Sequence, residues 1–212
     1  NGAGLVWNVG DPPVEGYSNF SYVALASLLI KLNIPPLLGL KVFSIGSLAV
    51  SVYILFLMSS FFLPRGLRVL PSILMLYMRG EILWTVSGLE TAFYQCLVLS
   101  ITYFVLKGVT KPVSRSNFIW AGFINALAGM TRPEAPFLLI TFVGGIFWQQ
   151  RMSLKPTSKL ALSKGIALYI LAFAVIFMPY FIWRWWYFKR LFANTIYCKA
   201  LFSSLPGFLD YN

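Results

Sequence analysis

The chain has 212 residues, of which 58% are hydrophobic and only 11% are charged. Soluble domains carry about 25% charged residues, and the mean hydropathy here is +0.76, so an ordinary soluble domain is excluded. The net charge of +11 would favour nucleic-acid binding in a soluble protein, but Lys and Arg also collect in membrane-protein loops, where they set orientation. No nucleic-acid partner is expected.

The apolar runs are continuous rather than alternating, which predicts an all-α, polytopic transmembrane helical bundle and not a barrel. Residues 1–18 are rich in Gly and Pro and predict a loop. Residues 19–33 predict a helix that is too short to cross and lies in the interface as a juxtamembrane helix. Pro35 and Pro36 end it.

A bilayer crossing takes about 20 apolar residues, and six crossings are expected at 40–62, 69–83, 89–106, 118–130, 136–148 and 165–182. The fourth and fifth are short, so a re-entrant pair is an alternative there.

The acidic and basic residues separate along this topology. The connections 63–68, 107–115 and 151–164 are basic and contain no acid. They alternate with segments that carry all six acids, which are Asp11, Glu15, Glu81, Glu90, Glu134 and Asp210. Because Lys and Arg favour the cytoplasmic side, we expect the acids outside. Glu15, Glu90 and Glu134 are then expected to converge on one outward-facing polar pocket.

Two of these acids have competing interpretations. Glu15 lies in a Gly- and Pro-rich loop that is either solvated, with turn-forming residues, or packed over a cavity with the carboxylate facing a substrate. Glu90 follows Ser87, which would cap the next helix while the acid favours the helix dipole. Alternatively Glu90 faces a polar cavity, because a carboxylate inside the membrane is energetically costly when it faces lipid.

The basic residues near the acids also have two interpretations. Arg132 and Glu134 flank Pro133 and form either a local ion pair or a phosphate clamp, because the planar guanidinium fork suits phosphate. The aromatic and basic tail predicts an interfacial belt or contacts to anionic lipid or phosphate; its cations are Arg184, Lys189, Arg190 and Lys199.

No metal-binding pattern is present in the sequence. The chain has two cysteines and no histidine, so neither CxxC nor HExxH spacing occurs. A carboxylate-bound divalent cation stays open as a cofactor, because oxygen ligands leave no compact signature. Cys96 lies in an apolar run and Cys198 in a polar flank, and no disulfide between them is expected.

Five strings, taken in order, resemble one family. GLVWN, PPVEGYSNF, WTVSGLETA, TRPEA and NTIYCK resemble bacterial arabinofuranosyltransferase-like, GT-C-type membrane glycosyltransferases. The resemblance implies an enzyme that lies among membrane lipids in a bacterial inner (plasma) membrane. Such an enzyme takes a sugar from a polyprenyl-phosphate donor and transfers it to a glycan, lipid or protein acceptor outside the membrane. It also implies a catalytic Asp shortly before GLVWN, and therefore before Asn1.

The resemblance assigns segments and residues. Residues 1–34 would be the remainder of the first extracytoplasmic loop, 35–183 the transmembrane bundle and 184–212 an extracytoplasmic tail. The chain opens inside a loop with Asn1, so a piece lacking the first transmembrane helix and a carboxy-terminal domain is expected. Glu15, Glu90 and Glu134 would support catalysis. The substrate-binding candidates are Arg132, Arg184, Lys199, Asn8, Tyr17, Asn194 and Tyr197.

Two other classes stay open. One is a structural subunit of a larger membrane assembly, and the other is a transporter or flippase of a lipid-linked substrate. An acidic pair upstream of Asn1 would favour the enzyme over the structural subunit. Neither a Walker loop nor a catalytic triad motif occurs in the sequence.

Overall fold

The computed structural model describes residues 4–6, 10, 13–110, 114–152 and 156–190, with the backbone alone for 156–158. All the regular secondary structure in these ranges is helical. The helices in chain order are α1 (Phe20–Lys31), α2 (Pro36–Ser59), α3 (Leu70–Tyr77), α4 (Arg79–Ser87), α5 (Thr91–Val109), α6 (Arg115–Thr131), α7 (Pro136–Met152) and α8 (Pro156–Phe188), with a 3₁₀ turn at Arg65–Leu67. The short helix expected at 19–33 is present as α1.

Proline and glycine set several of the helix boundaries. Pro36 and Pro136 are the first residues of α2 and α7, where the missing N–H has no intrahelical partner to lose. Gly88 follows α4 in the left-handed conformation, with φ of 73°, which glycine adopts without steric cost. These residues place the ends of the helices close to where the sequence predicts them.

The expectation of one continuous crossing at 69–83 is wrong. The segment forms α3 and α4, which meet at Met78 with a bend of 62°. Met78 has an extended backbone, with ψ of 111°, and Gly80 two residues later is a poor helix former. Glu81 then lies in the first turn of α4, where a carboxylate favours the positive end of the helix dipole.

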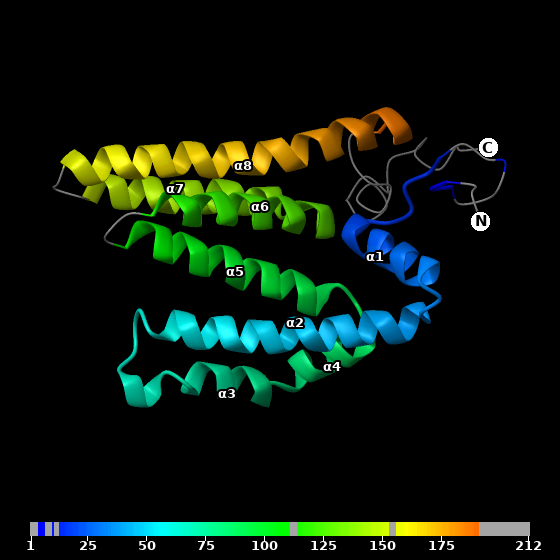
Figure 1. Ribbon diagram of the computed structural model, residues 1–212, viewed down its shortest axis with the longest axis horizontal. Helices are drawn as coiled ribbons and strands as arrows, with labels where there is room; N and C mark the ends of the chain where they lie inside the picture. The colour runs from blue at the N-terminus through cyan, green and yellow to red at the C-terminus, as the bar shows by residue number, and fades with distance from the viewer. Residues whose placement is uncertain (1–3, 7–9, 11–12, 111–113, 153–155, 191–212) are drawn as a thin grey trace, which may run out of the picture.

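The helices run back and forth along the long axis of the molecule, as Figure 1 shows. α6, α7 and α8 form one side, α5 lies next to them, and α2 with α3 and α4 forms the other side. The carboxyl-terminal ends of α2, α5 and α7 lie at one end of the bundle. α1, the turn before α5, the turn after α6 and the last turns of α8 lie at the opposite end. Among the described residues, the basic side chains after α2 and at the ends of α5 and α7 therefore lie at the end opposite to the turns that carry Glu90 and Glu134, as the charge pattern predicts.

The core centres on α6, which packs against both α5 and α8. Phe118, Ala121 and Ala128 of α6 are fully buried in it. Gly122 faces α8 so closely that an added Cβ would lie 2.8 Å from the Ala172 side chain and 3.0 Å from the Phe173 nitrogen. Small residues that let two helices approach are typical of packing in membranes, where van der Waals contact drives association.

Among the described residues, three helices are long and apolar enough to cross a membrane, which are α2, α5 and the part Lys159–Phe188 of α8. The bent pair α3–α4 brings the number to four if it is one span. This indicates an all-helical membrane protein. α6 and α7 have 17 residues each, and the prediction of six crossings stays a prediction.

Substitution of Gly122 tests the α6–α8 contact. Gly122→Ala should lower the free energy of unfolding by about 1–3 kcal/mol, because overpacking a tight contact forces the backbone to shift. The matched control is Gly144→Ala in α7, where an added Cβ meets nothing within 4 Å, and its stability should be unchanged or slightly raised. Thermal unfolding in detergent measures both. Equal melting temperatures for the two variants would contradict the close approach.

Orientation follows from the separation of charge between the two ends. In a Cys198→Ser background, Thr157→Cys should resist an impermeant thiol reagent in intact cells, because the basic end is expected in the cytoplasm. Val14→Cys, an exposed position in the chain segment before α1, should react. Strong labelling at position 157 with none at position 14 would reverse the orientation.

Candidate functional site

Five charged side chains gather at the end of the bundle on which α1 lies, and we call this end the acidic end. These five side chains, Glu15, Glu90, Glu134, Arg132 and Arg184, form two separate groups of ion pairs. Each group links segments that are far apart in the sequence. The two groups also differ in their access to solvent, and this difference decides what each of them can do.

The first group centres on Arg132. Its Nη2 donates to Glu90 Oε1 at 3.2 Å and its Nη1 donates to Glu134 Oε1 at 3.3 Å. The guanidinium carbon lies 5.3 Å from the centre of the Tyr94 ring, an arrangement that favours a cation. The side chains of Arg132, Glu90 and Glu134 are 33%, 18% and 54% exposed. The group is therefore partly open to solvent, mainly on the Glu134 side.

The backbone at Arg132 explains why this side chain leaves the bundle. α6 ends at Thr131, and Arg132 is extended, with φ of −143° and ψ of 136°. The residue before a proline is disfavoured in the helical region, so Pro133 accounts for the end of α6. The guanidinium Nε is buried and has no hydrogen-bond partner within the described part of the chain. A buried donor of this kind is costly unless a further acceptor reaches it.

The amino-terminal part of α1 is tied to this group by hydrogen bonds. Asn19 Nδ2, just before α1, donates to Glu90 Oε2 at 3.2 Å. The Ser21 hydroxyl donates to Thr131 Oγ1 at 2.8 Å, and the Tyr22 and Ser44 hydroxyls are 3.0 Å apart. These contacts hold α1 across the acidic end, on α2 and α6. Glu90 therefore bonds to Arg132 with one oxygen and to the α1 segment with the other.

The second group is the buried pair of Glu15 and Arg184. Arg184 Nε donates to Glu15 Oε1 at 2.7 Å and Nη2 donates to Oε2 at 2.5 Å, so the pair is bidentate. The side chains are 8% and 3% exposed for Arg184 and Glu15. The alternative of a solvated loop is therefore wrong for Glu15. The pair fastens the segment before α1 to the last turns of α8.

Tyr17 packs beside this pair. Its ring centre lies 6.4 Å from that of Phe20 and 6.0 Å from that of Phe188. Its hydroxyl is buried without a hydrogen-bond partner among the described residues. Burial raises the pKa of Tyr17, and the negative charge of Glu15 raises it further. The hydroxyl therefore stays protonated at neutral pH and is available as a donor.

The structure decides several of the sequence-based alternatives. Ser87 does not cap α5, because it is the last residue of α4 and its hydroxyl donates to the Trp84 carbonyl at 2.6 Å. The local Arg132–Glu134 ion pair is confirmed. Glu90 and Glu134 meet at Arg132, whereas Glu15 pairs with Arg184. The predicted pocket residues thus share one end of the bundle but belong to two groups.

Other sequence-based predictions lie outside the described residues. These are the predictions for Asp11, Asp210, Cys198, Asn8, Asn194, Tyr197 and Lys199. Within the described ranges, no three His, Cys, Asp or Glu side chains come together as a metal site. A divalent cation and a phosphate role for Arg184 stay predictions.

One supporting residue was missed by sequence reasoning. Asn125 is fully buried in α6, and in its favoured amide orientation it donates to the Ala135 carbonyl at 3.2 Å. Its oxygen accepts from the Leu139 N–H at 3.2 Å and from the Tyr169 hydroxyl at 2.8 Å. This contact supports the turn that carries Arg132 and Glu134. The available signal was an Asn inside an apolar helix, since such polar groups are buried only with partners.

Comparisons of the chain with protein-family models, with curated proteins and with solved structures give no match. The site is therefore defined by its own geometry. Its distinguishing feature is a partly exposed guanidinium between two carboxylates, at the end of an all-helical membrane bundle.

The buried pair should dominate the stability of the acidic end. Arg184→Ala leaves the Glu15 carboxylate buried without this partner and should lower the free energy of unfolding by about 3–5 kcal/mol. Replacing both partners with apolar residues, as in Glu15→Leu/Arg184→Met, should lower it much less, because no charge is then left buried. The control is Glu134→Gln, which removes a half-exposed partner and should change stability by less than about 1 kcal/mol. Unfolding of the wild-type protein and of these three variants in detergent is the measurement. A double variant no more stable than Arg184→Ala would contradict the prediction.

Proposed function

We propose that this chain belongs to an integral membrane glycosyltransferase of the GT-C type, which transfers a sugar from a polyprenyl-phosphate donor to an extracytoplasmic acceptor. One observation carries the proposal. The strings that resemble this family contact one another, although they are far apart in the sequence. Asn19 of PPVEGYSNF bonds to Glu90 of WTVSGLETA, which pairs with Arg132 of TRPEA.

A fourth string joins the same end of the bundle. The Leu5 N–H of GLVWN donates to the Tyr187 hydroxyl at 3.2 Å, in the last turn of α8, where Arg184 binds Glu15. Strings that follow one another along a chain need not meet in space. Their meeting at one end supports the interpretation that they build a common site, with α1 as the juxtamembrane helix beside it.

The chemistry of an inverting transfer gives the residues their proposed roles. A base removes the proton from the acceptor hydroxyl, and the resemblance implies that this base is an Asp before Asn1. Cations stabilise the departing phosphate. Arg132 is the best placed for this role, because its side chain is one-third exposed and its buried Nε has no partner among the described residues.

Binding of phosphate at Arg132 would displace Glu134 rather than Glu90. Glu134 is more exposed and contacts Nη1 at 3.3 Å, and exposed ion pairs contribute about 1 kcal/mol or less. Glu90 is held by Asn19 as well as by Arg132 and would keep the guanidinium oriented. In this proposal the acidic end faces the outside of a bacterial plasma membrane, with six crossings, and the acceptor is a glycan, a lipid or a protein.

A structural subunit of a larger membrane assembly is the second candidate. Arg132 and Arg184 already have carboxylate partners, which accounts for these two arginines without a substrate. This alternative predicts that the arginines matter for folding alone.

Substitution of Arg132 separates the two candidates. In the glycosyltransferase, Arg132→Ala should lower transfer from a polyprenyl-phosphate sugar by about 10²–10³-fold, because a lost contact to the leaving group raises the barrier. Arg132→Lys keeps the charge but loses the planar fork, so it should restore the rate only in part. Transfer by the protein in proteoliposomes is the measurement.

The matched control is Arg151→Ala, an exposed arginine at the end of α7 and at the opposite end of the bundle. It should keep the wild-type rate. If Arg132→Ala also keeps the wild-type rate and donor affinity while melting normally, the phosphate role is wrong and the local ion pair is the better account.

A further inference from the structure

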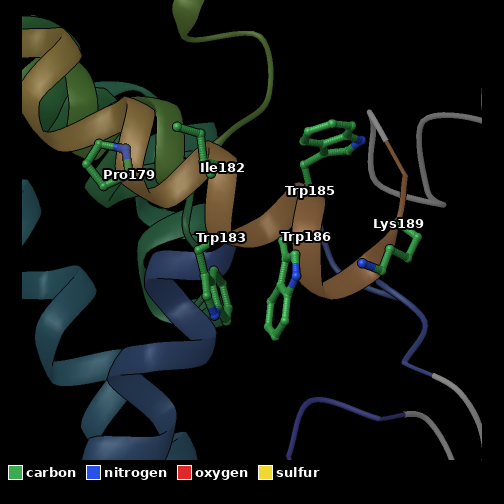
Figure 2. Close-up of a pocket in the computed structure, with 6 residues that line it drawn as sticks. All are labelled: Pro179, Ile182, Trp183, Trp185, Trp186 and Lys189. Atoms are coloured by element: carbon green, nitrogen blue, oxygen red, sulfur yellow. The ribbon is translucent and has the colours of Figure 1, made fainter.

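The last turns of α8 carry a groove that the proposed transfer does not use. It has a volume of about 530 Å³ and is lined by Pro179, Ile182, Trp183, Trp185, Trp186 and Lys189. In the view of Figure 2, the Trp183 and Trp186 side chains point to one side of the helix and the Trp185 side chain points to the other. Lys189 is the one charged residue among the six that line the groove.

The spacing of these residues explains why the groove faces away from the bundle. Pro179, Ile182 and Trp186 follow one another at intervals of three and four residues and therefore share one face of the helix. Lys189 comes directly after the end of α8 at Phe188 and has a left-handed backbone, with φ of 57°. Arg184 and Phe188 point inward and are buried, the first of them against Glu15. The ion pair thus fixes the rotation of these turns and leaves Ile182, Trp185 and Trp186 exposed.

Two of the tryptophans that line the groove, Trp183 and Trp186, are held by different contacts. Trp183 is packed by its neighbours, with its ring centre 5.6 Å from that of Tyr187 and 5.5 Å from that of Phe20. Trp186 contacts the Lys189 ammonium, which lies 5.3 Å from its ring centre. Within the described residues, Lys189 has no ion pair with a carboxylate. Its charge is therefore directed to the rim of an apolar groove.

We propose that this groove binds an anionic phospholipid from the surrounding membrane. The phosphate would pair with Lys189 at the rim, and one acyl chain would lie along Pro179, Ile182 and Trp183. The indole N–H groups of Trp185 and Trp186 are donors that can reach the ester or phosphate oxygens. This site is distinct from Arg132 and does not depend on the proposed transferase activity.

Charge and position on α8 favour this occupant. A groove with apolar walls and one cation at its rim complements an amphiphile with an anionic head and an apolar tail. The groove occupies the final turns of Lys159–Phe188, one of the candidate membrane spans, so it is continuous with a surface that lipid chains would cover. Trp residues are enriched where such a span meets the headgroups. A neutral sugar would leave Lys189 without a partner.

Quenching of tryptophan fluorescence by phospholipids with brominated acyl chains tests the site on the protein in detergent. Brominated phosphatidylglycerol should quench at roughly fivefold lower concentration than brominated phosphatidylcholine, which is the preference expected of one lysine near the headgroup. Lys189→Gln should abolish the preference. Trp186→Ala should reduce the quenched fraction.

The matched control is Lys31→Gln, which removes an exposed lysine from the last turn of α1 and lies outside the groove. It should keep the fivefold preference. Equal quenching by the two lipids in the wild-type protein, or an equal loss in Lys31→Gln, would overturn the proposal. Displacement of the brominated lipid by polyprenyl phosphate, but not by an excess of unbrominated phosphatidylglycerol, would assign the groove to the lipid-linked donor instead.

Discussion

The close contact between α6 and α8 is the constraint on which the acidic end depends. Gly122 lets the two helix backbones approach, and both helices run toward the same end of the bundle. α6 ends beside Arg132 and α8 ends a turn after Arg184. The packing of α6 on α8 therefore brings two arginines that are separated by 52 positions to one region of the molecule. Glu15 and Glu90, which pair with them, come from other segments of the chain, so these two ion pairs form only when the bundle has assembled.

The two ion-pair groups use the same chemistry in different surroundings. Glu15 and Arg184 are almost fully buried and bidentate, and a pair of this kind loses much when one partner is removed because the other charge stays desolvated. The Arg132 group is partly hydrated and shares one guanidinium between two acids. It can exchange a partner at small cost. The first arrangement suits anchoring of a chain segment, and the second suits reversible binding of an anion.

Much of the fold could be predicted from the sequence, and less of the site. Hydropathy and the prolines at positions 36 and 136 locate α2, α5 and α7 well, because burial of backbone polar groups in lipid leaves few alternatives to a helix. The expectation of 165–182 for the last helix is too short, since α8 runs from Pro156 to Phe188 and takes in part of the connection expected at 151–164. The break at Met78 was missed, since no proline marks it and Gly80 alone is a weak signal. The pairing of Glu15 with Arg184 spans 169 positions, and no local pattern encodes so distant a partner. Glu134 and Arg132 were predictable as a pair because they flank one proline.

The bend between α3 and α4 has a consequence for the order in which the molecule opens. α3 packs mainly on α2 and on α4, and many of its side chains, such as Leu74 and Tyr77, are exposed. Few buried contacts hold a segment of this kind, so its local opening requires less free energy than that of the α6–α8 centre. Amide hydrogens of α3 should therefore exchange with solvent deuterium sooner than those of α6, and the edge of the bundle can rearrange while the acidic end stays assembled.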